Sequence, residues 1–77
     1  MKLSELALGK KAEITKVESA LIPKSSLERL EEMGFVVGTI VTPMHRGLRG
    51  DAVAYEVRGG LIALRHGEAE CVEVTPQ

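Results

Sequence analysis

Histidine, carboxylate and thiol side chains gather near the C-terminal end of the 77-residue chain. His66, Glu68, Glu70 and Cys71 fall within six residues, and His45 lies farther upstream. Such side chains can bind transition metals, but zinc sites usually take their ligands as two closely spaced pairs, which this cluster lacks. A lone cysteine beside apolar residues is more typical of a small buried hydrophobe. The sequence therefore predicts no built metal site; the alternative left open is weak binding of Fe(II) or Mn(II) by His45, His66 and Glu68.

No grouping of side chains indicates catalysis. Glu31 and Glu32 are adjacent on a predicted helix, so they point in different directions and form a solvated face rather than an acid–base pair. The segment Gly47-Leu48-Arg49-Gly50 lacks the lysine and serine that a phosphate-binding loop requires. No spacing suggests a serine, histidine and acid grouping. We therefore predict that the protein is not an enzyme.

The segment HRGLRGD, residues 45–51, is predicted to be a long hairpin loop that contacts a protein partner. Leu48 stands between Arg46 and Arg49, and an exposed apolar anchor with charged residues at its rim is typical of a contact surface. The alternative is an ordinary mobile surface loop. The end of the predicted helix supplies a second part of the surface. The candidate partner-binding residues are Met33, Phe35, His45, Arg46, Leu48 and Arg49.

Composition excludes several classes of protein. The chain has 10 basic and 11 acidic residues, which argues against nucleic-acid binding by phosphate neutralisation and against a polybasic membrane anchor. No apolar run approaches the roughly 20 residues of a spanning helix, so direct membrane insertion is not expected. Phe35 and Tyr55 are the only aromatic residues, too few for base stacking or an aromatic-lined peptide groove. We expect one cytoplasmic domain over residues 1–77.

Five segments have the pattern of short strands: 12–17, 39–44, 52–58, 61–65 and 71–74. The alternation breaks after Ile14, which predicts a bulge or a strand end. Pro43 lacks an amide donor, so its strand is predicted to lie at a sheet edge or to carry a bulge. Tyr55 falls on the core face of its strand. Gly59-Gly60 is predicted to be a two-residue hairpin turn, and HGEAE, residues 66–70, a turn or one turn of 3₁₀ helix.

One helix of about two turns is predicted between the first two strands. Ser25 is its predicted N-cap, in a capping box with Glu28, and Ser26 is the competing cap. Leu27, Leu30 and Met33 recur at helical spacing, and Gly34 has the position of a left-handed terminating residue. The predicted fold is mostly β, about five strands and one short helix, curled or closed into a small barrel.

The pattern as a whole resembles the family of ferrous iron transport protein A (FeoA). LSELALGKKAEITKV resembles the leader and first strand of that family, and LERLEEMGFVVGTIV resembles its helix ending in Met-Gly. GDAVAYEVRGGLIALRHGEAECVEV resembles its C-terminal half. The resemblance covers nearly the whole chain, in order and with appropriate spacings.

This resemblance implies an SH3-like β-barrel. It also implies a small accessory protein that binds the cytoplasmic part of FeoB, the membrane subunit with a GTP-binding domain, and modulates Fe(II) transport. The alternative it implies is a divalent-metal-sensing module related to the C-terminal domain of iron-dependent repressors. The oligomeric state stays open, since an exposed edge at the Pro43 strand would permit two copies to associate.

Overall fold

The computed structural model describes residues 1–77, apart from the side chain of Leu21. Its strands are β1 (Ala12–Val17), β2 (Ile40–Arg46), β3 (Ala52–Val57), β4 (Gly60–Arg65) and β5 (Val72–Pro76). Its helices are α1 (Lys24–Glu32) and α2 (His66–Ala69), with 3₁₀ turns at Leu3–Glu5 and Ser19–Leu21. The single longer helix lies between β1 and β2, as predicted.

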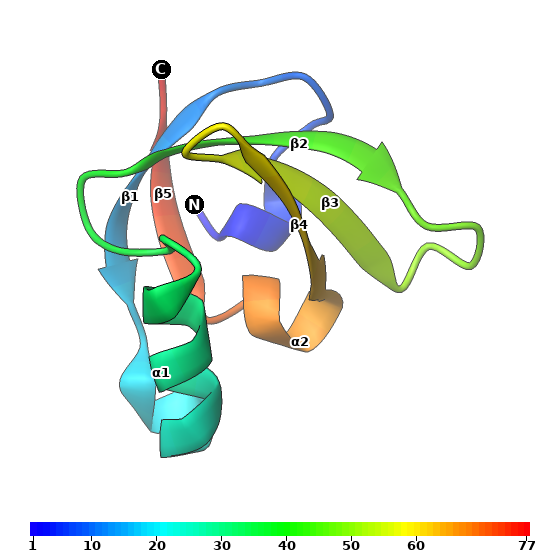
Figure 1. Cartoon of the computed structure of the whole chain (residues 1–77). Coiled ribbons are helices and arrows are strands. Elements are labelled where there is room, and N and C mark those ends of the chain that lie inside the picture. The colour runs from blue at the N-terminus through cyan, green and yellow to red at the C-terminus, as the bar shows by residue number, and fades with distance from the viewer.

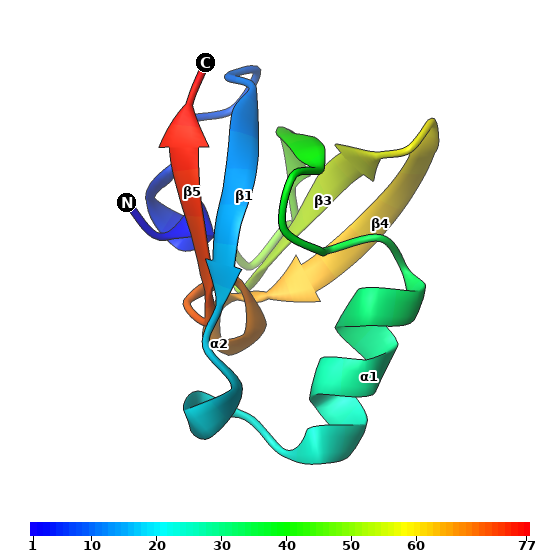
Figure 2. The same cartoon turned by 90° about the vertical axis from the view of Figure 1, so that its left-hand side faces the viewer.

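The strands form one antiparallel sheet in the order β4-β3-β2-β1-β5. The sheet curls, so that β1 and β5 lie on one side and β3 and β4 on the other, with α1 below them (Figures 1 and 2). Within the described residues the end strands β4 and β5 do not pair, so the sheet is curled rather than closed. The predicted mostly-β, five-strand fold is confirmed.

The inside of the curl holds an aliphatic core around two aromatic rings. Phe35 and Tyr55 meet edge to face, with ring centroids 6.3 Å apart and an interplanar angle of 89°, an arrangement that aromatic pairs favour. Tyr55 lies on the core side of β3, as predicted. The core residues, all buried, are Leu3, Leu6, Ala12, Ile14, Leu30, Phe35, Val41, Tyr55, Val57, Leu64, Ala69, Val72 and Val74.

Helix α1 ends in a hydrogen-bonded reversal at Gly34. The Gly34 amide donates to the Glu31 carbonyl at 3.1 Å, and the Phe35 amide donates to the Leu30 carbonyl at 2.9 Å. This pair of bonds is the Schellman motif, which needs a left-handed residue between helix and exit. Gly34 supplies it with φ +102°, as the sequence predicted, and the reversal directs Phe35 into the core.

The start of α1 differs from the prediction. Pro23 holds the N-cap position with extended backbone, and no side chain caps the helix. The amides of Ser26 and Leu27 both donate to the Pro23 carbonyl, at 3.0 and 3.1 Å. The helix thus begins at Lys24, which places Ser25 inside the first turn, where its side chain cannot cap. The predicted caps at Ser25 and Ser26 are wrong.

Strand β2 is central in the strand order, but at Pro43 its β1 side has no ladder partner, which agrees with the local edge predicted there. The alternative, a bulge, is also confirmed: the register with β3 shifts between Pro43 and His45. A ladder with β1 includes only Ile40 and Val41 of this strand, so the missing amide of Pro43 interrupts no bond to β1. The Pro43 carbonyl instead accepts from the Gly9 amide at 2.7 Å.

Three connections also differ from prediction. The β3–β4 turn is Arg58-Gly59 rather than Gly59-Gly60, because Gly60 already pairs with Val57 in the strand ladder. Both turn residues have positive φ values, 51° and 82°, as a two-residue type I′ hairpin turn requires. Residues 66–69 form α2 rather than a 3₁₀ turn. β2 runs to Arg46, so the hairpin loop is shorter than the predicted 45–51. The predicted bulge after Ile14 is confirmed.

Candidate functional site

The β2–β3 hairpin projects from the body of the molecule (Figure 1). The apolar residue Leu48 lies in the loop between its two strands. Leu48 is fully exposed, and its charged neighbours Arg46 and Arg49 are also at the surface. The loop is tied at its base, since the Gly47 amide donates to the Ala52 carbonyl at 2.8 Å and the Gly50 amide to the Gly47 carbonyl at 2.9 Å. Leu48 is thus exposed between two exposed arginines, and its contact with a partner stays a prediction.

The end of α1 provides a second surface, with a different composition from the predicted one. Met33 is half-buried against the core, and Phe35 is completely buried. Phe35 therefore offers no surface to a partner, because the reversal at Gly34 turns its ring inward. Val37 is 66% exposed but is missing from the predicted set. Of the three apolar residues between Gly34 and Gly38, the first fills the core and the last is exposed.

An apolar groove lies beside this helix end. It runs between α1, the end of β1 and the segment that follows Gly34. Its lining contains one charged residue, Glu31, and one uncharged polar residue, Ser19, and the others are apolar. The lining residues are Val17, Ser19, Leu27, Glu31, Phe35, Val36 and Val37.

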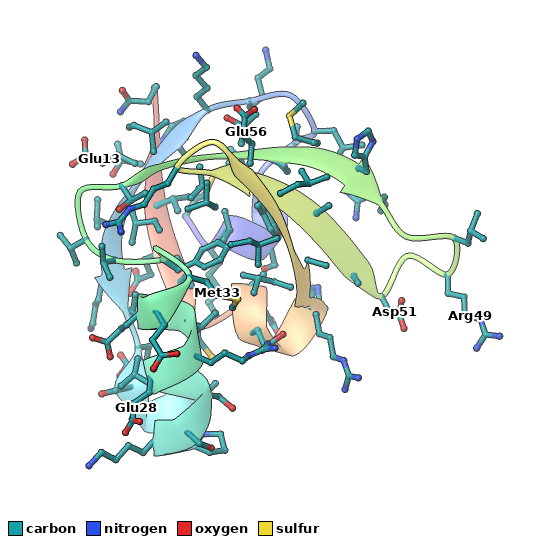
Figure 3. All side chains as sticks on the ribbon, in the orientation of Figure 1. Glu13, Glu28, Met33, Arg49, Asp51 and Glu56 are labelled. Carbon is teal, nitrogen blue, oxygen red and sulfur yellow. The ribbon has the colours of Figure 1, made fainter. Side chains whose placement is uncertain are left out.

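The predicted partner-binding residues thus fall into two separate places. The hairpin, with Arg49 at its tip, and α1, with Glu28 on its outer side, lie at opposite ends of the molecule (Figure 3). One flat partner surface cannot cover both ends. Met33 belongs to the helix end, whereas His45, Arg46, Leu48 and Arg49 belong to the hairpin.

The residues considered for metal binding are not brought together. Arg46 lines a small pocket with His66, and His45, one residue earlier on the strand, points to the opposite face. Glu68 is engaged, since one carboxylate oxygen accepts from the Arg65 amide at 3.0 Å and the other pairs with Arg29. Within the described residues, no three histidine, cysteine or acidic side chains are placed to hold a metal ion.

Calorimetric titration with Fe(II) or Mn(II) under anaerobic conditions tests the weak metal site. We expect no saturable heat above the buffer level, because binding would have to displace Arg29 from Glu68. Saturable heat that disappears in His66→Ala would contradict this expectation and support the metal-sensing alternative.

Cys71 and Tyr55 are buried titratable groups. The Cys71 thiol donates to the Gly67 carbonyl at 3.3 Å, and burial raises its pKa, so it packs as the predicted small hydrophobe. Burial also raises the pKa of the Tyr55 hydroxyl, which the Arg46 guanidinium opposes. Tyr55, with Arg46, Asp51 and His66, lines the pocket beneath the hairpin.

The absorbance of Tyr55 at 295 nm can be followed alone, because the chain has one tyrosine and no tryptophan. We expect its titration midpoint to lie above about 10 in the folded protein and to return to about 10 in urea. A raised folded pKa favours the protonated form, so this contribution to stability is complete below about pH 10 and is lost as pH rises through the folded pKa. An unshifted midpoint would show that the hydroxyl is solvated.

Comparison with known families and structures gives consistent matches. The model of the FeoA domain matches residues 1–76. FeoA from Chlorobium tepidum is 33% identical, with a TM-score of 0.87 over 99% of this chain and 70% of that one. Iron(II) transport protein A from Clostridium thermocellum is 33% identical, with a TM-score of 0.88; the match covers 99% of this chain but 45% of that one.

A third match links the fold to a described class. FeoA from Stenotrophomonas maltophilia, crystallised with zinc and described as an SH3 domain protein, is 34% identical with a TM-score of 0.85, over 97% of this chain and 89% of that one. A manganese-dependent transcriptional repressor has a TM-score of 0.88 at 13% identity, over 100% of this chain and 36% of that one, which shows a common fold alone. No curated protein matches the chain. The predicted SH3-like fold is confirmed.

Proposed function

The chain belongs to the FeoA domain family, and from that premise we propose that it binds the cytoplasmic part of FeoB and modulates Fe(II) transport without catalysing a reaction itself. Membership in this family implies a role in ferrous iron transport. None of the described helices is long and apolar enough to cross a membrane. We place the protein in the cytoplasm, where the GTP-binding domain of FeoB would be its partner.

The observation that supports a protein contact is the tip of the β2–β3 hairpin. Leu48 is fully exposed on a hydrogen-bonded loop, so its burial against a partner would be favourable. Transfer of one leucine side chain from water into a partner's pocket stabilises a complex by about 1.5–3 kcal/mol. Arg46 and Arg49 would then meet acidic groups at the rim of that pocket and orient the contact.

A binding titration with the purified GTP-binding domain of FeoB from the same organism tests the proposal. It is run with and without guanine nucleotide and with and without Fe(II). We expect saturable binding in at least one condition and a loss of roughly tenfold or more with Leu48→Asp.

Leu61→Asp is the matched control, because Leu61 is 57% exposed on β4, away from the hairpin. Its affinity should equal that of the unmodified protein. An equal loss in both variants would refute the hairpin as the contact, and no binding in any condition would refute the proposed partner domain.

A further inference from the structure

The hairpin tip and the apolar groove are complementary, although they lie at opposite ends of the same chain. We propose that the groove beside α1 binds the β2–β3 hairpin of a second copy of this protein, with Leu48 as the inserted side chain. This self-association goes beyond the proposed contact with the transporter, and its test requires only this chain.

The groove has the size and lining that a leucine side chain needs. Its volume is about 320 Å³, larger than the roughly 150 Å³ apolar cavity that accepts a benzene ring. Val36 and Leu27 are half-buried in its wall, and Val37, at 66% exposure, stands in its lining. Insertion of Leu48 would remove apolar surface from water on both partners, which is the main favourable term in association.

The charges around the two features are opposite. Glu31 lines the groove, and Glu28 lies one helical turn before it on the exposed side of α1. Arg46 and Arg49 flank Leu48. Within the described part of the chain none of these four side chains forms an ion pair. An inserted Leu48 would therefore bring two arginines toward two carboxylates, which favours this occupant over an apolar segment with acidic flanks.

The contact must form between copies. Arg49 lies on the projecting hairpin and Glu28 on α1, at opposite ends of the molecule (Figure 3). Because the hairpin and the groove lie at opposite ends of the molecule, two copies make one such contact at a time, so the association is head-to-tail and extends into a ring or a short chain. One side chain and its charged rim form a small interface, so the association is weak, with oligomers populated at protein concentrations on the order of 1 mM.

Sedimentation equilibrium on two single variants tests the proposal. Leu48→Asp removes the inserted side chain but leaves the groove intact, whereas Val37→Asp places a charge in the groove but leaves the hairpin intact. Both residues are exposed, so both variants should fold, which circular dichroism verifies. We expect the unmodified protein to associate as its concentration rises and each variant alone to be monomeric.

The decisive sample is an equimolar mixture of the two variants. The intact hairpin of Val37→Asp fits the intact groove of Leu48→Asp, and neither partner can extend the assembly, so the mixture should form a 1:1 dimer and nothing larger. Glu31→Lys should weaken association of the unmodified chain at low salt. A monomeric unmodified protein near 1 mM, variants that still associate alone, or a mixture that stays monomeric would each overturn the proposal. Sedimentation of this chain alone contains no FeoB, so its outcome does not depend on the proposed contact with the transporter.

Discussion

Replacing Phe35 with alanine is expected to lower the free energy of unfolding by about 3–5 kcal/mol. The Phe35 ring is completely buried and meets Tyr55 edge to face. The substitution therefore removes the free energy gained by burying the ring away from water, and it also removes the aromatic contact. The whole stability of a 77-residue domain is roughly 4–12 kcal/mol. The substitution therefore removes between about a quarter and all of the stability, depending on where the protein lies in that range.

Urea denaturation followed by far-ultraviolet circular dichroism measures this loss. Val37→Ala is the control, because it removes an apolar side chain two residues away that is 66% exposed. It should change the free energy of unfolding by less than about 1 kcal/mol. Equal losses in the two variants would contradict the assignment of Phe35 to the core.

Gly34→Ala is expected to lower the free energy of unfolding by about 2–4 kcal/mol, which is the second largest of the predicted effects. Gly34 has φ +102°, a conformation that side-chain-bearing residues adopt only with strain. A Cβ atom there would also lie 3.0 Å from Arg58 Cδ and 3.1 Å from Val57 Cγ1. The flexible Arg58 side chain can turn aside, but the buried Val57 side chain would have to give by a few tenths of an ångström.

Gly38→Ala is a matched control for the backbone term. Gly38 has φ +93°, but no atom lies within 4 Å of a Cβ built on it. Gly38→Ala should lower the free energy of unfolding by about 1–2 kcal/mol, which is the penalty for the left-handed backbone conformation alone. The difference between the two variants, measured by urea denaturation, gives the cost of close packing at Gly34. Equal costs would show that the helix end has room for a side chain.

Much of the fold follows from local patterns in the sequence. Alternation located β1 at its correct bounds, and Gly34 marked the helix end because only a left-handed residue closes that reversal. The environment of Pro43 was harder to predict. Proline excludes a regular ladder, but it does not distinguish a sheet edge from a bulge. Strand order depends on pairing between segments that are distant in the sequence. The start of α1 was mispredicted for a related reason. The Pro23 carbonyl accepts the amide hydrogen bonds that a serine side chain was expected to accept.

The candidate site was less predictable than the fold. Leu48 was identifiable, because a single leucine among glycines and arginines has no periodic neighbours to pack against. Phe35 and Val37 could not be ordered by hydrophobicity, as burial there depends on which side chain the reversal at Gly34 turns inward. The groove joins Val17, Leu27 and Val37, residues far apart in sequence. It becomes visible only when β1 and α1 are placed in space.

The most direct test of the proposed function is amide mapping of the isotopically labelled protein during titration with the GTP-binding domain of FeoB. The account predicts saturable shifts concentrated at residues 46–51 of the hairpin, and their disappearance in Leu48→Asp with the rest of the spectrum unchanged. Shifts confined to α1 and the groove, or none in any nucleotide and iron condition, would contradict it.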